Sequence, residues 1–170
     1  MLRSGDVKIT KTSKENLDLL HGLLTSVNEP YWPIFDIGLN EFKNQFRDNQ
    51  FWTEKFKRFL VWNDSKLVGL VNAFFTAPYS DSIELGYIIF DPELRRRGLM
   101  RKAVELVIRY FFEVEGQARL QIGVTPNNKT SIEFARKLGF QSEGTLRSFF
   151  KLRSVRKDVE IFSILKDEWK

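Results

Sequence analysis

The sequence contains no cysteine and only one histidine among its 170 residues. Without cysteine, the chain can form neither a disulfide framework nor a thiolate metal site, and it has no thiol nucleophile. The lone His21 lies within a helical pattern and has no companion at metal-ligand spacing. A hydrolase with a Ser-His-Asp triad and a histidine-rich metal enzyme are therefore both disfavoured, and we expect no metal site.

Long hydrophobic runs are lacking as well. No apolar run approaches the roughly 18–20 residues that a membrane span needs, and the mostly polar stretch Met1–Lys8 does not resemble a secretory signal. We therefore expect a cytoplasmic protein that does not associate with membranes. The length of 170 residues, without repeats, low-complexity tracts or an evident linker, predicts a single domain over residues 1–170.

The chain is basic, with a net charge of +5 and a pI of about 9.5. This charge favours an anionic ligand, such as nucleic acid or a phosphate-bearing cofactor. A nucleic-acid-binding module would interleave aromatic residues with the basic ones for base stacking. Many of the aromatics instead lie in residues 28–54, where five acidic and two basic residues give a balance of −3 and leave the rest of the chain near +8. Nucleic acid is therefore the less favoured partner, although this class of protein stays open.

A basic loop between a strand and a helix is the most informative stretch. The apolar run Ile83–Phe90 predicts a buried strand, which Asp91-Pro92 ends. Beyond Gly98, helical spacing of Leu99, Ala103, Leu106, Val107 and Phe111 predicts a helix. The N-terminus of a helix presents unpaired N–H groups and the positive end of the dipole, which favour phosphate. With five cations nearby (Arg95, Arg96, Arg97, Arg101 and Lys102), Gly98 predicts a diphosphate site, although an ordinary solvated turn would have the same composition.

The rest of the pattern predicts strands and helices in an order typical of a mixed sheet. The expected strands are Val7–Thr10, Phe59–Trp62, Leu67–Phe75, Ile83–Phe90, Leu120–Val124, Phe140–Leu152 and Val159–Leu165. Helices are expected after a Ser13 cap, around Phe42 and Phe46, after Gly98, and over Ser131–Leu138 before Gly139. Loops are expected at residues 77–81 and at the basic turn Arg153–Lys157. We therefore predict an α/β (α+β) fold with a mixed central sheet of about seven strands and helices on both faces.

Two motifs resemble those of the GNAT acetyltransferase superfamily. Arg95-x-x-Gly98-x-Met100 is similar to Arg/Gln-x-x-Gly-x-Gly/Ala, the acyl-CoA pyrophosphate loop of that family, with a methionine that its Rim-type branch tolerates. About 30 residues later, the segment from Asn128 to Phe140 resembles the Asn-x-x-Ser…Lys-Leu-Gly-Phe signature of the Rim-type ribosomal-protein N-acetyltransferases. Glu84-Leu85-Gly86-Tyr87, Glu143-Gly144 and the closing Leu165–Trp169 are also similar to this branch, so the resemblance covers essentially the whole chain.

The resemblance implies an enzyme that transfers an acetyl group from acetyl-CoA to a primary amine in a ternary complex, without a metal. It implies that two parallel strands, Ile83–Phe90 and Leu120–Val124, separate at a bulge and admit the pantetheine arm, while a backbone N–H polarises the thioester carbonyl. The implied cofactor-binding residues are Ile88, Ile89, Phe90, Arg95, Arg96, Arg97, Gly98, Leu99, Met100, Arg101, Lys102, Asn128 and Ser131.

Two candidate catalytic residues follow from the same resemblance. Ser131 would assist the departing thiolate, since Ala135 occupies the position of the family's tyrosine acid; its alternative role is to cap the helix. Family glutamate bases correspond here to Gly123 and Phe150, which leaves Glu84, acting through water or merely pairing with a neighbouring strand. These missing groups keep a non-catalytic CoA-binding protein open.

The acceptor that we favour from the sequence is the α-amino group of a protein N-terminus, with a polyamine or an antibiotic amine as alternatives. The acidic, aromatic-rich residues 28–54 are expected either to line a pocket for a cationic amine or to pack the second helix onto the sheet. Pro30 and Pro33 favour an open-edged loop there, which suits a peptide. A homodimer is one assembly compatible with this reading.

Overall fold

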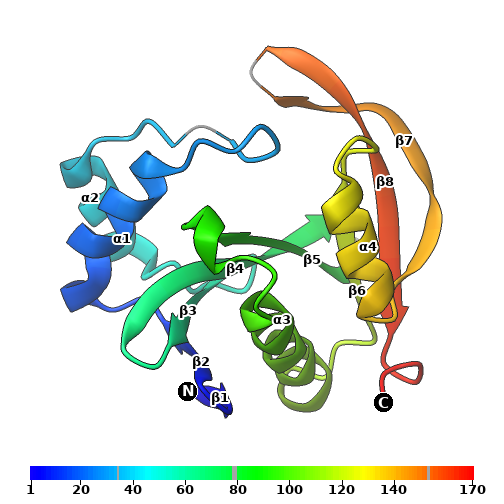
Figure 1. The fold of residues 1–170 in the computed structure, drawn as a ribbon, viewed down its shortest axis with the longest axis horizontal. Coiled ribbons are helices and arrows are strands. Elements are labelled where there is room, and N and C mark those ends of the chain that lie inside the picture. The colour runs from blue at the N-terminus through cyan, green and yellow to red at the C-terminus, as the bar shows by residue number, and fades with distance from the viewer. Residues whose placement is uncertain (34, 78–79, 153) are drawn as a thin grey trace.

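A mixed eight-stranded sheet organises the computed structural model, which describes residues 1–33, 35–77, 80–152 and 154–170. The strand order is β1-β2-β3-β4-β5-β6-β8-β7, and every neighbouring pair is antiparallel except β5 and β6. The strands are β1 (Leu2–Ser4), β2 (Val7–Lys11), β3 (Phe56–Asn63), β4 (Lys66–Ala77), β5 (Ser80–Ile89), β6 (Arg119–Val124), β7 (Gln141–Leu152) and β8 (Val155–Leu165). Figure 1 shows β5 and β6 within this sheet and the long β7–β8 hairpin, which forms one of its edges.

Helices cover both faces of the sheet, as the sequence predicts. On one face lie α1 (Leu17–Ser26) and α2 (Leu39–Asn49), which contact each other. On the other lie α3 (Leu99–Arg109), its π-helical continuation Tyr110–Val114, and α4 (Lys129–Lys137) (Figure 1). Short 3₁₀ turns, Lys14–Asn16 and Pro92–Leu94, precede α1 and α3.

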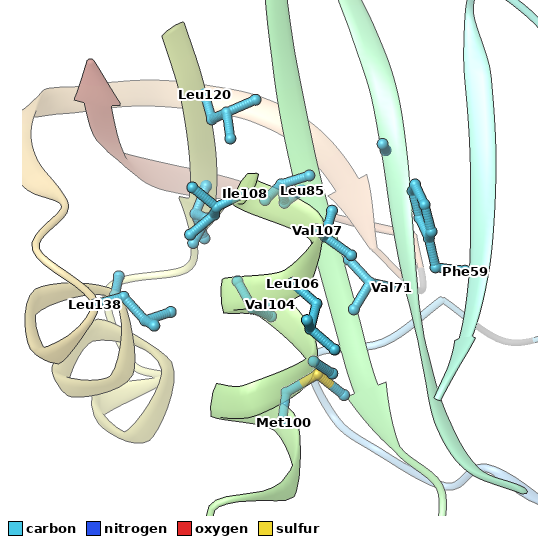
Figure 2. Close-up of a cluster of buried hydrophobic side chains, with 14 of the residues drawn as sticks. Phe59, Val71, Leu85, Met100, Val104, Leu106, Val107, Ile108, Leu120 and Leu138 are labelled. Atoms are coloured by element: carbon cyan, nitrogen blue, oxygen red, sulfur yellow. The ribbon is translucent and has the colours of Figure 1, made fainter. Parts of the chain in front are cut away.

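Each face has its own hydrophobic core because strand side chains alternate between the two faces. The larger core packs α3 and α4 onto the sheet and includes Val71, Leu85, Val107 and Leu120 (Figure 2). The smaller core joins α1 and α2 to the opposite face through Leu20, Phe42, Leu60, Leu70 and Ile88. Ile88 of β5 and Phe90 directly after it thus face α1 and α2, whereas Leu85 and Ile89 of β5 face α3.

The helical spacing predicted after Gly98 is confirmed, because all five of its apolar positions are buried. Gly139 follows α4 with a φ of 90°, which is the left-handed conformation that ends many helices. Ser13 precedes the short 3₁₀ turn and not α1 itself. Local apolar periodicity therefore predicted the helices well and their first residues less well.

Two strand predictions need correction. The first strand was missed: Leu2–Ser4 pairs with β2, and a turn at Gly5 (φ 59°) joins them. The last strand begins at Val155, so most of the expected basic turn is extended chain paired with β7. Charged residues are tolerated there because β7 is exposed along nearly its whole length and offers no apolar face to match. Pro78, Tyr79 and Arg153, which fall in the two predicted loops, lie outside the described residues.

Candidate active site

The parallel strands β5 and β6 share only two residue pairs before they separate. Ile83 pairs with Leu120 and Glu84 with Gln121, and no further pair follows toward the carboxyl ends. Beyond β5 the chain leads into α3, and beyond β6 it leads into α4, so the N-termini of two helices flank this separation (Figure 1). Ligands in open α/β sheets bind at the carboxyl ends of the strands at such a point. We call the region beyond Glu84 and Gln121 the β5–β6 splay.

The splay does not arise from the expected bulge. The register between β4 and β5 runs without interruption from Gly69↔Ile89 to Phe75↔Ile83, so β5 is regular where it leaves β6. The close fit of β4 holds β5 in place: a Cβ at Gly69 would lie 2.2 Å from the Ile88 carbonyl oxygen. Strand β5 therefore stays with β4, and the pairing with β6 ends.

The N-terminus of α3 is shaped by two residues in the left-handed region. Arg96 has a φ of 60° and Gly98, the N-cap, a φ of 76°. The Lys102 N–H bonds to the Gly98 carbonyl, so the three preceding N–H groups, those of Leu99, Met100 and Arg101, have no acceptor within the helix. A Cβ built at Gly98 meets nothing within 4 Å, and the backbone is open to an anionic ligand at this point.

The five cations near this terminus are not equivalent. Three are engaged: Arg95 with Glu29 at 2.6 Å, Arg101 with Glu105 at 2.9 Å, and Lys102 with Asp6 at 2.6 Å. The hydrogen bond from Lys102 lowers the pKa of Asp6 below its usual value. Arg96 and Arg97 are exposed, and the described part of the chain places no ion-pair partner on either. These two are the side chains best placed to meet a phosphate.

Several of the predicted cofactor contacts are restricted by the structure. The side chains of Leu99 and Met100 are buried in the larger core, where Figure 2 shows Met100 beneath α3, so only their backbones can reach a ligand. The Phe90 N–H bonds to the Val68 carbonyl at 3.0 Å, and by strand alternation the Ile88 N–H also faces β4. Of the three predicted backbone positions, Ile89 alone faces the splay, where its carbonyl lies 3.4 Å from the Arg95 guanidinium.

Glu84 stands on β5 in the last residue pair with β6, and its side chain lies on the side of the sheet covered by α1 and α2. Its carboxylate accepts a hydrogen bond from the Gln121 amide at 2.9 Å, and Gln121 in turn accepts one from Arg119 at 3.3 Å. A Cβ built at Gly123 would lie 3.3 Å from the Glu84 carboxylate. The Glu84 carboxylate therefore occupies the space beside Gly123, where a glutamate side chain on β6 would otherwise begin.

The N-terminus of α4 lies at the other border of the splay, on the side of the sheet that α3 covers. The Asn128 side chain caps this helix by accepting a hydrogen bond from the Ser131 N–H at 3.2 Å. The alternative role expected for Ser131, capping the helix with its hydroxyl, is therefore wrong. The Ser131 hydroxyl instead neighbours the hydroxyl of Tyr87 on β5, and the Tyr87 ring packs against Phe134 with centroids 4.8 Å apart.

The acidic segment of residues 28–54 is mainly structural. Most of its aromatic residues pack between α1, α2 and the sheet, where Phe42 and Phe51 are almost fully buried. This supports the packing role expected as one of two alternatives. Trp52 instead packs against Phe59 and Tyr110 in the larger core, and Tyr31 is exposed. Glu29 pairs with Arg95, and the Tyr31 hydroxyl reaches the Asn127 carbonyl at 3.2 Å. The segment thus contacts both the loop before α3 and the turn before α4.

Chemically different groups border the splay at the start of α3, at the start of α4 and on the opposite side of the sheet. The α3 side offers free N–H groups and two arginines, which fit the phosphates of CoA, and the α4 side offers hydroxyl groups. The opposite side of the sheet offers the Glu84 carboxylate. Sequence reasoning did not assign roles to Tyr87, Gln121 or Tyr31, because each is defined by a partner more than 30 residues away. The described residues contain no cluster of three or more His, Asp or Glu that could hold a metal ion.

This fold, with a splayed parallel pair between two helix N-termini, is that of an acetyltransferase. Residues 24–140 match the Acetyltransferase (GNAT) family, which is more than half of the chain, and the protein therefore belongs to this family. None of the described helices has the length and apolar character needed to cross a bilayer.

The proteins similar to this chain are named for more than one acceptor. A probable N-acetyltransferase, YjcK of Bacillus subtilis, is 32% identical over 104 residues, which cover 61% of this chain and 57% of that protein. The spermidine N(1)-acetyltransferase of Escherichia coli K12 is 28% identical over 151 residues, or 85% of this chain and 77% of that protein. A structure of RimL, a ribosomal L7/L12 α-N-protein acetyltransferase in complex with coenzyme A, superposes with a TM-score of 0.83 at 17% identity and covers 97% of both chains.

Proposed function

We propose that this protein is an N-acetyltransferase that moves an acetyl group from acetyl-CoA to a primary amine. The observation that carries the proposal is the β5–β6 splay, where the N-termini of α3 and α4 meet beyond a parallel pair that ends after two residue pairs. Family membership supports the same chemistry. Acetyl-CoA supplies the activated acetyl group.

On the side of the sheet that α3 and α4 cover, the residues at the start of α3 would bind the phosphates of CoA, and those at the start of α4 would border its thiol. The N–H groups at the start of α3, with Arg96 and Arg97, bind the diphosphate. The exposed backbone edge of β5 at Ile89 binds the pantetheine arm in the manner of an added strand. Asn128 and Ser131 border the thiol end. An N–H on the same edge of β5 polarises the thioester carbonyl.

The transfer itself needs one proton to leave the amine and one to reach the sulfur. The amine nitrogen forms a bond to the acetyl carbon, the carbon–sulfur bond breaks, and the electron pair stays on sulfur. Glu84, on the α1–α2 side of the splay, takes the amine proton directly or through water, and the thiolate is stabilised by a hydrogen bond from Ser131 before it is protonated. In this scheme the amine approaches from the side of the sheet opposite to Ser131.

For the acceptor, we propose the α-amino group of a protein or peptide. Binding of a polyamine by charge needs several carboxylates spaced along it, and among the site residues assigned above Glu84 alone supplies a carboxylate. Glu29 is already paired with Arg95. Spermidine is the second candidate, because the relative that matches 85% of this chain is a spermidine N(1)-acetyltransferase.

A thiol-release assay tests both levels of this proposal. Because the chain contains no cysteine, every thiol detected comes from CoA and the protein contributes no background. We expect release with N-terminal peptides and a much lower kcat/KM with spermidine or an aminoglycoside. Release with spermidine alone would overturn the acceptor, and CoA binding without turnover of any amine would favour a non-catalytic CoA-binding protein.

A further inference from the structure

We propose that Tyr87 is a positioning residue: its hydroxyl donates a hydrogen bond to the Ser131 hydroxyl oxygen and so directs the Ser131 O–H toward the sulfur of the bound thioester. The inference rests on the proposed function and adds a residue to it. It starts from the Tyr87 hydroxyl, which is a buried polar group. No contact within the described residues gives the Tyr87 hydroxyl a hydrogen bond of ordinary geometry, although that oxygen is closed off from solvent.

The position of the Tyr87 hydroxyl selects Ser131 as its partner. Tyr87 lies on β5 beside the splay, and its ring is held against Phe134, one turn of α4 beyond Ser131. Ser131 is close enough to the phenol to lower its pKa, but burial dominates and raises the pKa of Tyr87 to about 12. The phenol therefore keeps its proton throughout the neutral range and can donate it to a neighbouring oxygen. Because the Tyr87 hydroxyl oxygen is buried, it acts on the sulfur of the bound thioester through the Ser131 hydroxyl and not by direct contact.

The usual competing partner of Ser131 is already occupied. A serine in the first turn of a helix often donates its hydroxyl proton back to the carbonyl four residues earlier, which here is that of Asn127. That carbonyl accepts hydrogen bonds from the Lys129 N–H at 3.0 Å and from the Tyr31 hydroxyl at 3.2 Å. A carbonyl oxygen has two lone pairs, so both are used. The Ser131 proton is thus available to a ligand.

A hydrogen bond from Tyr87 would fix the direction in which the Ser131 O–H points. A hydroxyl rotates about its C–O bond unless a partner fixes it, and accepting a hydrogen bond also makes it a better donor. Hydrogen bonds within an active site are often long before the substrate binds and tighten in the complex. We expect the bond between Tyr87 and Ser131 to tighten when the thioester is bound.

The test compares Tyr87→Phe, Ser131→Ala and the double variant with the unchanged protein. Tyr87→Phe keeps the ring on Phe134 and removes only the hydroxyl. We expect it to lower kcat about tenfold with little change in the KM for acetyl-CoA, and to leave the Tm unchanged or raised, because the lost hydroxyl had no partner. The double variant should be no slower than Ser131→Ala alone, since Tyr87 acts through Ser131. Tyr110→Phe, which removes a phenol hydroxyl bonded to Glu115 beyond the far end of α3, is the control for activity and should leave kcat and the KM for acetyl-CoA unchanged.

A second measurement does not depend on turnover. In a cysteine-free protein the CoA thiol is the only thiol in the complex, so its ionisation can be followed by the ultraviolet absorbance of the thiolate. We expect Tyr87→Phe to raise the pKa of the bound CoA thiol by about half a unit to one unit, the scale of one neutral hydrogen bond. Ser131→Ala should raise it at least as much, and the double variant no further.

The outcomes separate this inference from the proposed function. An unchanged protein that binds no CoA or acetylates no amine would overturn the proposed function itself. If the unchanged protein is active, then a normal kcat and thiol pKa in Tyr87→Phe would overturn only the role of Tyr87. Additive losses in the double variant would show that Tyr87 acts independently of Ser131. A lower Tm with kcat preserved would show that the hydroxyl is purely structural.

Discussion

Replacing Gly98 with asparagine should weaken CoA binding while leaving the fold nearly as stable. Gly98 is the N-cap of α3, with φ 76° and ψ −1°, in the left-handed region. Asparagine enters this region more readily than other residues with a Cβ, so the backbone can stay in place. Its side chain would then project into the space beside the first turn of α3, where a Cβ meets no atom within 4 Å. The substitution therefore separates the steric effect on the ligand from the strain on the backbone.

The expected sizes follow from the structure. If the side chain displaces the diphosphate from one N–H, the loss is that of a charge-assisted hydrogen bond, about 1.5–3 kcal/mol. This corresponds to a CoA Kd roughly tenfold to a hundredfold higher. Alanine at the same position would cost about 1–2 kcal/mol of folding free energy through its left-handed φ. For a chain of this length that is a fall in Tm of about 2–8 °C. A β-branched residue such as valine would combine both effects and is the less informative change.

Calorimetric titration with CoA and thermal unfolding of the same samples measure the two effects separately. Gly116 offers a matched control, because it also has a positive φ (72°) and open surroundings but follows the opposite end of α3. We expect Gly116→Asn to bind CoA like the unchanged protein, and Gly116→Ala to lose a comparable amount of stability. A CoA Kd for Gly98→Asn within twofold of the unchanged protein would refute the diphosphate site at α3.

Three further changes test the rest of the site. Ser131→Ala should lower kcat about 100-fold without changing CoA affinity or Tm, since the Asn128 side chain and not the Ser131 hydroxyl caps α4; a lower Tm with normal kcat would return Ser131 to a structural role. Glu84→Gln keeps an acceptor for the Gln121 amide, so it should lower kcat/KM for the amine by about 10²-fold at unchanged stability, and unchanged rates from neutral to alkaline pH would exclude Glu84 as the base. Glu29→Gln should raise the KM for acetyl-CoA by up to about fivefold, because it removes the partly exposed ion pair with Arg95. A change in the KM for the amine alone would instead show that Glu29 contacts the acceptor.

Much of the site could be predicted from the sequence because it depends on local signals. The strand before Asp91, the glycine at the start of α3 and the apolar spacing after it are all contained in the one stretch Ile83–Phe111. Each feature reflects a backbone rule that acts over a few residues: proline ends a strand, glycine admits a positive φ, and a 3.6-residue period buries one helix face. The diphosphate site therefore stays a prediction with a defined geometry behind it.

The pairing of the charges could not be predicted in this way. Five cations around Gly98 are equivalent in the sequence, but the fold brings Glu29 to Arg95 and Asp6 to Lys102 from far along the chain. The same is true of the acidic, aromatic-rich segment. Its composition fits an amine pocket, whereas most of its aromatic side chains are used to pack α1 and α2 against the sheet. Composition shows which groups are present, but it does not show which partner each group contacts in the folded protein.

The sequence by itself determined the order of the elements after β1, the glycine at the start of α3 and the membership of the chain in an acetyltransferase family. Only the tertiary structure decided that Glu84 fills the space beside Gly123, that Phe90 gives its N–H to β4, and that the Tyr87 hydroxyl lies buried beside Ser131. The physical reason is the range of the interactions. Propensity, turns and capping act between neighbours in the chain, whereas the register of a sheet and the packing of a helix on it bring together side chains that no sequence spacing relates.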